Sequence, residues 1–193
     1  TYKFDEDRMV YATWSTGYRP GGVNRRGSLP PYQSDFLTNF EFGWKTSWFD
    51  NTLRWNGAIY AERWENFQFS ILGSQGLTEI KNAAQAHVLG LETDIVWRPV
   101  TGLTLTGGLA VTDAQLADNY CGYLSPSGEP ETNCAAPLAP AGTELPTTPK
   151  LKANLVARYE FPVGEYEAHV QGAVVYVGET WTDLRLVERA IIG

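Results

Sequence analysis

The sequence lacks several features that would place it in common protein classes. No window of about eighteen apolar residues occurs, which excludes a transmembrane helix, and the first residues lack the basic and then apolar order of a signal peptide. The 15 Lys and Arg are outnumbered by 22 Asp and Glu, and the net charge is −7. Because the basic residues form no cluster, we expect no nucleic-acid partner.

Groups suited to catalysis or metal binding are also sparse. His87 and His169 are the only histidines, and no acidic or cysteine cluster completes the spacing of a metal site. Gly-x-Ser-x-Gly and phosphate-loop motifs are absent. No nucleophile, base and orienting residue occur together, so we expect neither an enzyme nor a bound cofactor. Cys121 and Cys134 lack the second ligand pair of a zinc site, and their shared stretch, rich in Pro, favours a disulfide in an oxidising compartment.

Aromatic residues and glycine are abundant instead, with 7 Trp, 10 Tyr, 8 Phe and 19 Gly, a balance typical of β-strands. The strongest pattern runs from Asn39 to Phe49, where aromatic and polar residues alternate and so occupy opposite faces of a strand. About ten residues of this pattern match a tilted strand that crosses a bilayer, roughly 9 to 11 residues long. The polar face of such a strand lines a lumen.

The same period of two predicts seven antiparallel strands. A tight turn at Asp50-Asn51 joins the second to the third and pairs Trp48 with Leu53, Trp44 with Gly57 and Lys45 with Asn56. We expect irregular loops over Gly17 to Asp35, from the end of the Trp64 to Gln68 stretch through Asn82, and over Asp113 to Pro149. The predicted strands are Met9 to Thr16, Asn39 to Phe49, Leu53 to Tyr60, Ala84 to Trp97, Leu103 to Thr112, Leu151 to Phe161 and Tyr166 to Tyr176.

The connections between these strands alternate between long and short. In an up-and-down sheet this order places every short turn at one rim and every long loop at the other, as in outer-membrane barrels. The pattern therefore predicts an all-β fold whose antiparallel strands form part of a large transmembrane β-barrel. The lipid-facing aromatic residues are Phe40, Phe42, Trp44, Trp48, Trp55, Trp97, Tyr159 and Tyr166, and the lumen-facing residues are Glu41, Lys45, Arg54, Glu92, Asp94, Arg158 and His169.

Several short motifs, taken in order, resemble one family. They are Gly17-Tyr18-Arg19-Pro20-Gly21-Gly22, alternating polar residues in the second and third strands, the stretch from Trp64 to Gln68, Asn82-Ala83 and Thr148-Pro149-Lys150. In this order and spacing the chain resembles the later part of the barrel domain of TonB-dependent outer-membrane receptors.

The resemblance implies a barrel of about 22 strands closed by an N-terminal plug. Such receptors take up scarce ligands, for example ferric siderophores, with energy delivered by TonB, and lie in the Gram-negative outer membrane. Residues 1–193 would then be a partial barrel domain, without the plug and the final strands. Its partners would be the lipid bilayer, the plug, the remaining strands and, through the missing N-terminal region, TonB.

Two other classes stay open on the sequence alone. One is a passive porin, and the other is a soluble β-sandwich or jelly roll that binds carbohydrate. For the receptor, Arg19, Arg25 and Arg26 in the first loop are candidates to meet an anionic ligand at the external mouth.

Overall fold

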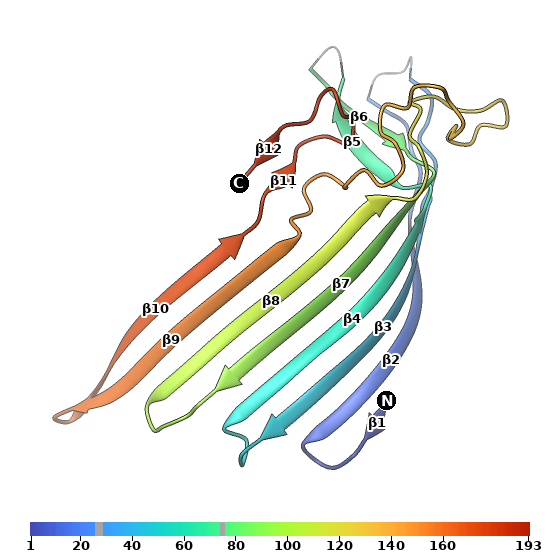
Figure 1. Ribbon diagram of the computed structural model, residues 1–193. Coiled ribbons are helices and arrows are strands. Elements are labelled where there is room, and N and C mark those ends of the chain that lie inside the picture. Colours follow the sequence, from blue (N-terminus) through green and yellow to red (C-terminus); the bar gives the residue numbers. More distant parts are fainter. Residues whose placement is uncertain (26–28, 74–75) are drawn as a thin grey trace.

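The computed structural model describes residues 1–25, 29–73 and 76–193. Figure 1 shows one curved antiparallel sheet with short turns along one rim and the longer loops gathered at the other. The sheet order is β1-β2-β3-β4-β7-β8-β9-β10, so each long strand lies beside the long strand that precedes it in the chain. Its strands are β1 (Tyr2–Lys3), β2 (Arg8–Arg19), β3 (Asp35–Trp48), β4 (Leu53–Glu65), β7 (Gln85–Trp97), β8 (Leu103–Leu116), β9 (Leu151–Val163) and β10 (Tyr166–Val177).

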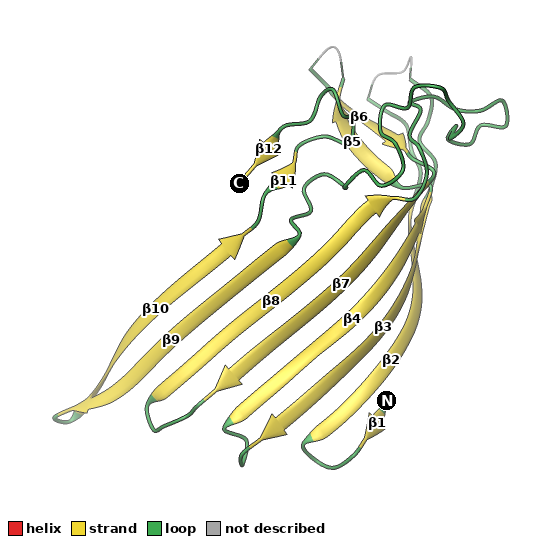
Figure 2. Cartoon of the chain, in the orientation of Figure 1, coloured by secondary structure: helices red, strands yellow, loops and turns green. Residues whose placement is uncertain are grey.

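The seven predicted strands are confirmed as the seven long strands of this sheet (Figure 2). Among the described residues, no helix is long and apolar enough to span a membrane. The short β1 also pairs with β2, which the sequence did not predict.

The predicted register of the first hairpin is confirmed. Trp48 pairs with Leu53, Trp44 with Gly57 and Lys45 with Asn56. The turn itself is wider than Asp50-Asn51, because β3 ends at Trp48 and β4 begins at Leu53. Phe49, Asp50 and Asn51 all have positive φ, of 54°, 54° and 66°. A shift of the pairing by one residue would place the aromatic residues opposite Arg and Asn. The side chains of the strands therefore determine the register, and the turn adopts the conformation that this register requires.

The predicted loops are shorter and more ordered than expected. The stretch before Asn82 was predicted to be irregular, and this prediction was wrong, because it contains the hairpin of β5 (Gln68–Leu72) and β6 (Thr78–Asn82). Similarly, β2 continues to Arg19, β3 begins at Asp35 and β8 continues to Leu116. Two further short strands, β11 (Thr180–Trp181) and β12 (Ile191–Ile192), pair after the last long strand. Contacts between loops order these segments. Such contacts produce no periodic pattern of apolar residues in the local sequence.

The hydrophobic core lies at the loop end of the sheet. It joins the β5–β6 hairpin, the loop-side ends of β7 and β8, the long loop 117–150 and the segment after β10. Half-buried Tyr60 and Trp64 pack against it. Its buried residues are Phe67, Phe69, Ile71, Ala83, Ala86, Val88, Ala114, Leu116, Tyr120, Ala139, Leu145 and Leu184.

Candidate functional site

The long strands present one aromatic and one polar face. Successive strand residues point to opposite faces, and the register aligns these faces across the whole sheet. The aromatic face carries all eight aromatic residues predicted to face lipid, and many of its large apolar side chains are exposed, including Phe40, Phe42 and Trp55. The polar face carries the seven charged residues predicted to face a lumen: Glu41, Lys45, Arg54, Glu92, Asp94, Arg158 and His169.

Side chains of the polar face bond to one another across strands. The Tyr11 hydroxyl on β2 donates to Glu41 Oε1 on β3 at 2.7 Å. Asn56 Nδ2 on β4 donates to Asp94 Oδ2 on β7 at 3.1 Å. A cavity of about 700 Å³ lies along this face and is bordered by Tyr11, Lys45, Asn56 and residues of β7 to β10. The face therefore borders a hollow whose lining combines hydrogen-bonding groups with small and apolar side chains.

Three aromatic rings on the sheet cover glycines of the neighbouring strand. Trp44 lies over Gly57, its predicted pairing partner, on the aromatic face, while Tyr11 covers Gly43 and Tyr60 covers Gly90 on the polar face. A Cβ atom at Gly57 would collide with the Trp44 ring, so only glycine leaves room for it.

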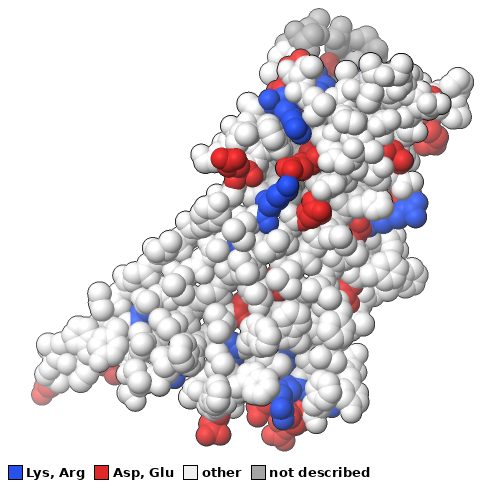
Figure 3. Space-filling view, in the orientation of Figure 1, with Lys and Arg blue, Asp and Glu red and all other residues white. Residues whose placement is uncertain are grey.

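Charged groups gather at the two ends of the sheet on the face seen in Figure 3, with a mostly uncharged region between them. At the short-turn rim, the Arg8 guanidinium lies 5.2 Å from the centre of the Trp48 ring. Trp44 and Trp55 meet edge to face at 5.4 Å, and the Trp55 Nε1–H donates to Thr93 Oγ1 at 2.8 Å. Tryptophan with a satisfied N–H suits the boundary between an apolar layer and water.

At the loop end, a buried carboxylate ties four strands together. Asp35 at the start of β3 is 1% exposed and forms an ion pair with Arg19 at the end of β2. The Trp64 Nε1–H from β4 donates to Asp35 Oδ2 at 2.9 Å, and the Gln68 backbone N–H of β5 donates to the same oxygen at 3.1 Å. Arg19 also donates to the Gln68 carbonyl and stacks on Trp64 at 4.8 Å. These contacts fix the base of the loops to the sheet.

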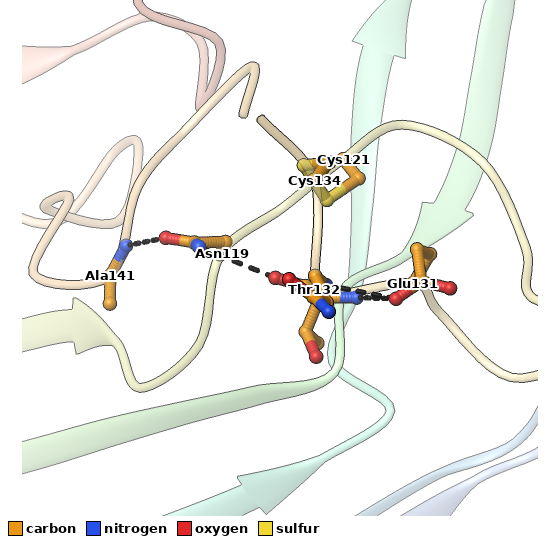
Figure 4. Close-up of a disulfide and its surroundings, with 7 residues drawn as sticks. Asn119, Cys121, Glu131, Thr132, Cys134 and Ala141 are labelled. Carbon is orange, nitrogen blue, oxygen red and sulfur yellow. Dashed lines mark hydrogen bonds between the residues drawn. A yellow bond between two sulfur atoms is a disulfide. The ribbon is translucent and has the colours of Figure 1, made fainter. Parts of the chain in front are cut away.

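The long loop 117–150 is folded around a disulfide. Figure 4 shows the bond between Cys121 and Cys134, with Cα atoms 6.1 Å apart. Beside it the Asn119 side chain accepts from the Ala141 backbone N–H at 2.9 Å and donates to the Thr132 carbonyl at 3.3 Å. The loop therefore has an ordered base held by side-chain hydrogen bonds and a covalent closure.

Tyr120 and Asp183, both outside the long strands, have shifted pKa values. Burial raises the pKa of the Tyr120 hydroxyl to about 12. Burial alone would also raise the pKa of Asp183, but hydrogen bonds from the Arg185 guanidinium and backbone hold that pKa below its usual value. Both pKa shifts result from the packing of these groups. Within the described residues no cluster of His, Cys, Asp or Glu is arranged to hold a metal ion.

Comparison with known proteins identifies this arrangement. The family model described as "TonB dependent receptor-like, beta-barrel" matches residues 1–187. The chain belongs to the TonB-dependent receptor family. Proteins of this family are non-enzymatic transport proteins of the Gram-negative outer membrane, and this chain is an outer-membrane protein. The soluble carbohydrate-binding sandwich is thereby excluded.

Several solved receptor structures share the fold at low sequence identity. The ferric yersiniabactin uptake receptor of Yersinia pestis is 19% identical with a TM-score of 0.70, over 99% of this chain and 27% of that one. The siderophore receptor PiuA of Acinetobacter baumannii is 21% identical with a TM-score of 0.67, over 95% and 26%. The ferric preacinetobactin receptor of the same species is 18% identical with a TM-score of 0.63, over 94% and 25%. The chain thus spans about a quarter of the length of these receptors.

The three arginines predicted to meet a ligand differ in their surroundings. Arg19 forms an ion pair with Asp35, donates a hydrogen bond to the Gln68 carbonyl and stacks on Trp64, so most of its hydrogen-bonding capacity is used within the receptor. Arg25 is exposed, and Arg26 lies outside the described residues. Sequence reasoning missed Asp35 and Gln68. The Trp64 to Gln68 motif was a signal for this network, but its partner at Asp35 lay inside a predicted loop.

Proposed function

We propose that this chain supplies barrel wall and external loops to an outer-membrane receptor for the energy-coupled uptake of a scarce ligand such as a ferric siderophore. The observation that carries the proposal is the match of nearly the whole chain to the TonB-dependent receptor barrel. The three similar solved structures are described as receptors for siderophores or their ferric complexes, which favours this ligand class.

In this proposal the aromatic face contacts lipid and the polar face lines the lumen. Exposed Phe and Trp side chains are stable against acyl chains, whereas Glu92 and Asp94 require water or polar partners. The short-turn rim, with Trp48 and Trp97, lies at the periplasmic interface, and the loops with the disulfide lie outside the cell.

The partners of the chain are the rest of its receptor and the energy-transducing protein. The sheet has free edges at β2 beyond β1 and at β10, and backbone groups at such edges require further strands in a bilayer. The hollow of the polar face accommodates the plug, and TonB acts through the N-terminal region of the receptor.

Uptake by the complete receptor tests the function. Cells that lack the receptor gene should fail to accumulate radiolabelled iron from at least one ferric siderophore of a panel, and the restored gene should return uptake only when TonB is present. Uptake that persists without TonB would instead establish a passive porin.

Site-directed spin labels test the assignment of the faces. Leu91 and Glu92 are neighbours on opposite faces of β7. In vesicles, a label at Leu91→Cys should be more accessible to lipid-soluble oxygen, and a label at Glu92→Cys should be less accessible to it. The reverse order would assign the aromatic face to the lumen.

A further inference from the structure

A cavity of about 310 Å³ lies among three external segments, away from the hollow of the polar face. Its walls come from the loop between β2 and β3, from β6, and from the disulfide-closed loop directly after Tyr120. Leu29, Pro30, Pro31, Ile80, Tyr123 and Leu124 supply most of the apolar lining. This volume is at the lower end of the range of small-molecule sites in proteins, about 300 to 1,000 Å³, and suits a ligand of one ring.

Side-chain amides hold the three walls in place. Asn24 Nδ2 donates to the Ile80 carbonyl at 3.0 Å, and the Ile80 N–H donates back to Asn24 Oδ1 at 2.8 Å, so the Asn24 carboxamide takes the place of a neighbouring strand at the edge of β6. Asn82 exchanges the same two kinds of bond with the backbone of Gln33 at 2.8 and 3.0 Å. Gln33 Nε2 then donates to the Gly128 carbonyl at 2.6 Å, which attaches the disulfide-closed loop, between Cys121 and Cys134, to the loop between β2 and β3. The cavity is therefore formed before any ligand arrives.

The polar groups left to a ligand can all donate hydrogen bonds. The amides of Asn24 and Asn82 are used in the walls, whereas within the described residues the hydroxyls of Tyr32 and Tyr123 have no hydrogen-bond partner. Lys81 also borders the cavity and forms an ion pair with Glu79, in which Nζ lies 3.8 Å from Oε2, too far for a hydrogen bond. Free hydroxyls and an ammonium beside apolar walls favour an anionic oxygen on a flat, apolar body.

We propose that this cavity binds a one-ring aromatic acid, with the ring between the prolines and Tyr123 and the acidic oxygens toward the hydroxyls and Lys81. The site lies outside the hollow that the uptake function requires, and it depends on a different observation. Binding can be measured on the purified receptor without TonB, so a failure of this proposal and a failure of the uptake function give separate results.

Calorimetric titration of the complete receptor in detergent tests the site with three probes. Benzoate carries the ring and the charge, benzyl alcohol the ring without the charge, and acetate the charge without the ring. We expect benzoate to bind at least about tenfold more tightly than either of the others, because each partial probe loses one class of contact. Equal binding of the three probes would overturn the proposal.

Variants locate the binding. Leu124→Asp places a negative charge in the wall and should abolish benzoate binding, and Tyr123→Phe, which keeps the ring, should weaken it by about three- to tenfold. Tyr166→Phe at the opposite rim is the matched control and should bind as the parent does. Heat-resistant migration and an intact disulfide verify that each variant is folded. Unchanged binding in folded Leu124→Asp would place benzoate elsewhere.

Discussion

The long strands and the loop end of this receptor segment are stabilised in different ways. In the strands, backbone hydrogen bonds run from one strand to the next, and the aromatic face leaves its apolar side chains exposed. At the loop end, buried Phe69, Tyr120 and Leu184 form a core of the kind found in water-soluble proteins. In the proposed arrangement the strands face lipid on one side, whereas the loop end is packed around buried side chains, so the same kind of substitution should have effects of different size in the two regions.

Removal of a core aromatic should have the largest effect. Phe69 is 5% exposed and packs edge to face on Tyr120 at 5.0 Å. We expect Phe69→Ala to lower the free energy of opening of the loop end by about 3 to 5 kcal/mol. Hydrogen exchange of loop amides in the complete receptor measures this quantity.

Phe36 is the matched control for Phe69. It lies on the aromatic face at the loop side and is 51% exposed. Phe36→Ala should leave exchange in the loops nearly unchanged. Similar effects of the two substitutions would show that the loop end has no core of its own.

A charge on the aromatic face should have the next largest effect. Leu155 in the middle of β9 is 54% exposed, and its neighbour Asn154 lies on the polar face. Leu155→Arg should destabilise the receptor in vesicles by about 2 to 4 kcal/mol, because the guanidinium is placed in the acyl layer, whereas Asn154→Arg should cost less than about 1 kcal/mol. Denaturant unfolding in vesicles compares the pair, and equal losses would contradict the division of the faces.

A methyl group added to the sheet should have a smaller, position-dependent effect. Gly57→Ala forces the Trp44 ring away and should cost about 1 to 3 kcal/mol. Gly172 on the same face of β10 has no heavy atom of this chain within 4 Å of the added Cβ, and on the contacts of this chain Gly172→Ala should change the unfolding free energy by less than about 1 kcal/mol. Denaturant unfolding in vesicles measures both variants. An unchanged unfolding free energy in Gly57→Ala would show that the Trp44 ring can move to another position without cost.

The smallest effect concerns pH at the loop end. The hydrogen bond from Lys150, at 2.6 Å, lowers the pKa of Glu144, whose other oxygen accepts from the Trp181 Nε1–H at 3.0 Å. A lowered carboxyl pKa adds stability above the ordinary pKa of 4.5, and this stability is lost as pH falls through the folded value. Trp181 fluorescence should therefore change in acid.

The Glu144→Gln variant isolates this change. Because Gln does not titrate, the difference between parent and variant fluorescence removes the contributions of the other tryptophans. A difference that stays constant from neutral pH to well below 4.5 would contradict the role of the Glu144 carboxylate.

The sequence predicted the long strands well because their constraint is local. Residues such as Phe42 and Trp44 repeat with the period of a strand, and Trp44 opposite Gly57 fixes the register without reference to the rest of the molecule. The same period identified the residues of each face before any contact was known. The loop end has no such period, so the β5–β6 hairpin was missed.

The sequence by itself determined the number and order of the long strands, the register of the β3–β4 hairpin and which residues share a face, because alternation and pairing act between near neighbours in the chain. Only the tertiary structure decided that Arg19 bonds to Asp35, that Asn24 completes the edge of β6 and that Phe69, Tyr120 and Leu184 meet in one core. These contacts join residues far apart in the sequence. Their partners become apparent only when the sheet has brought the loops to one rim.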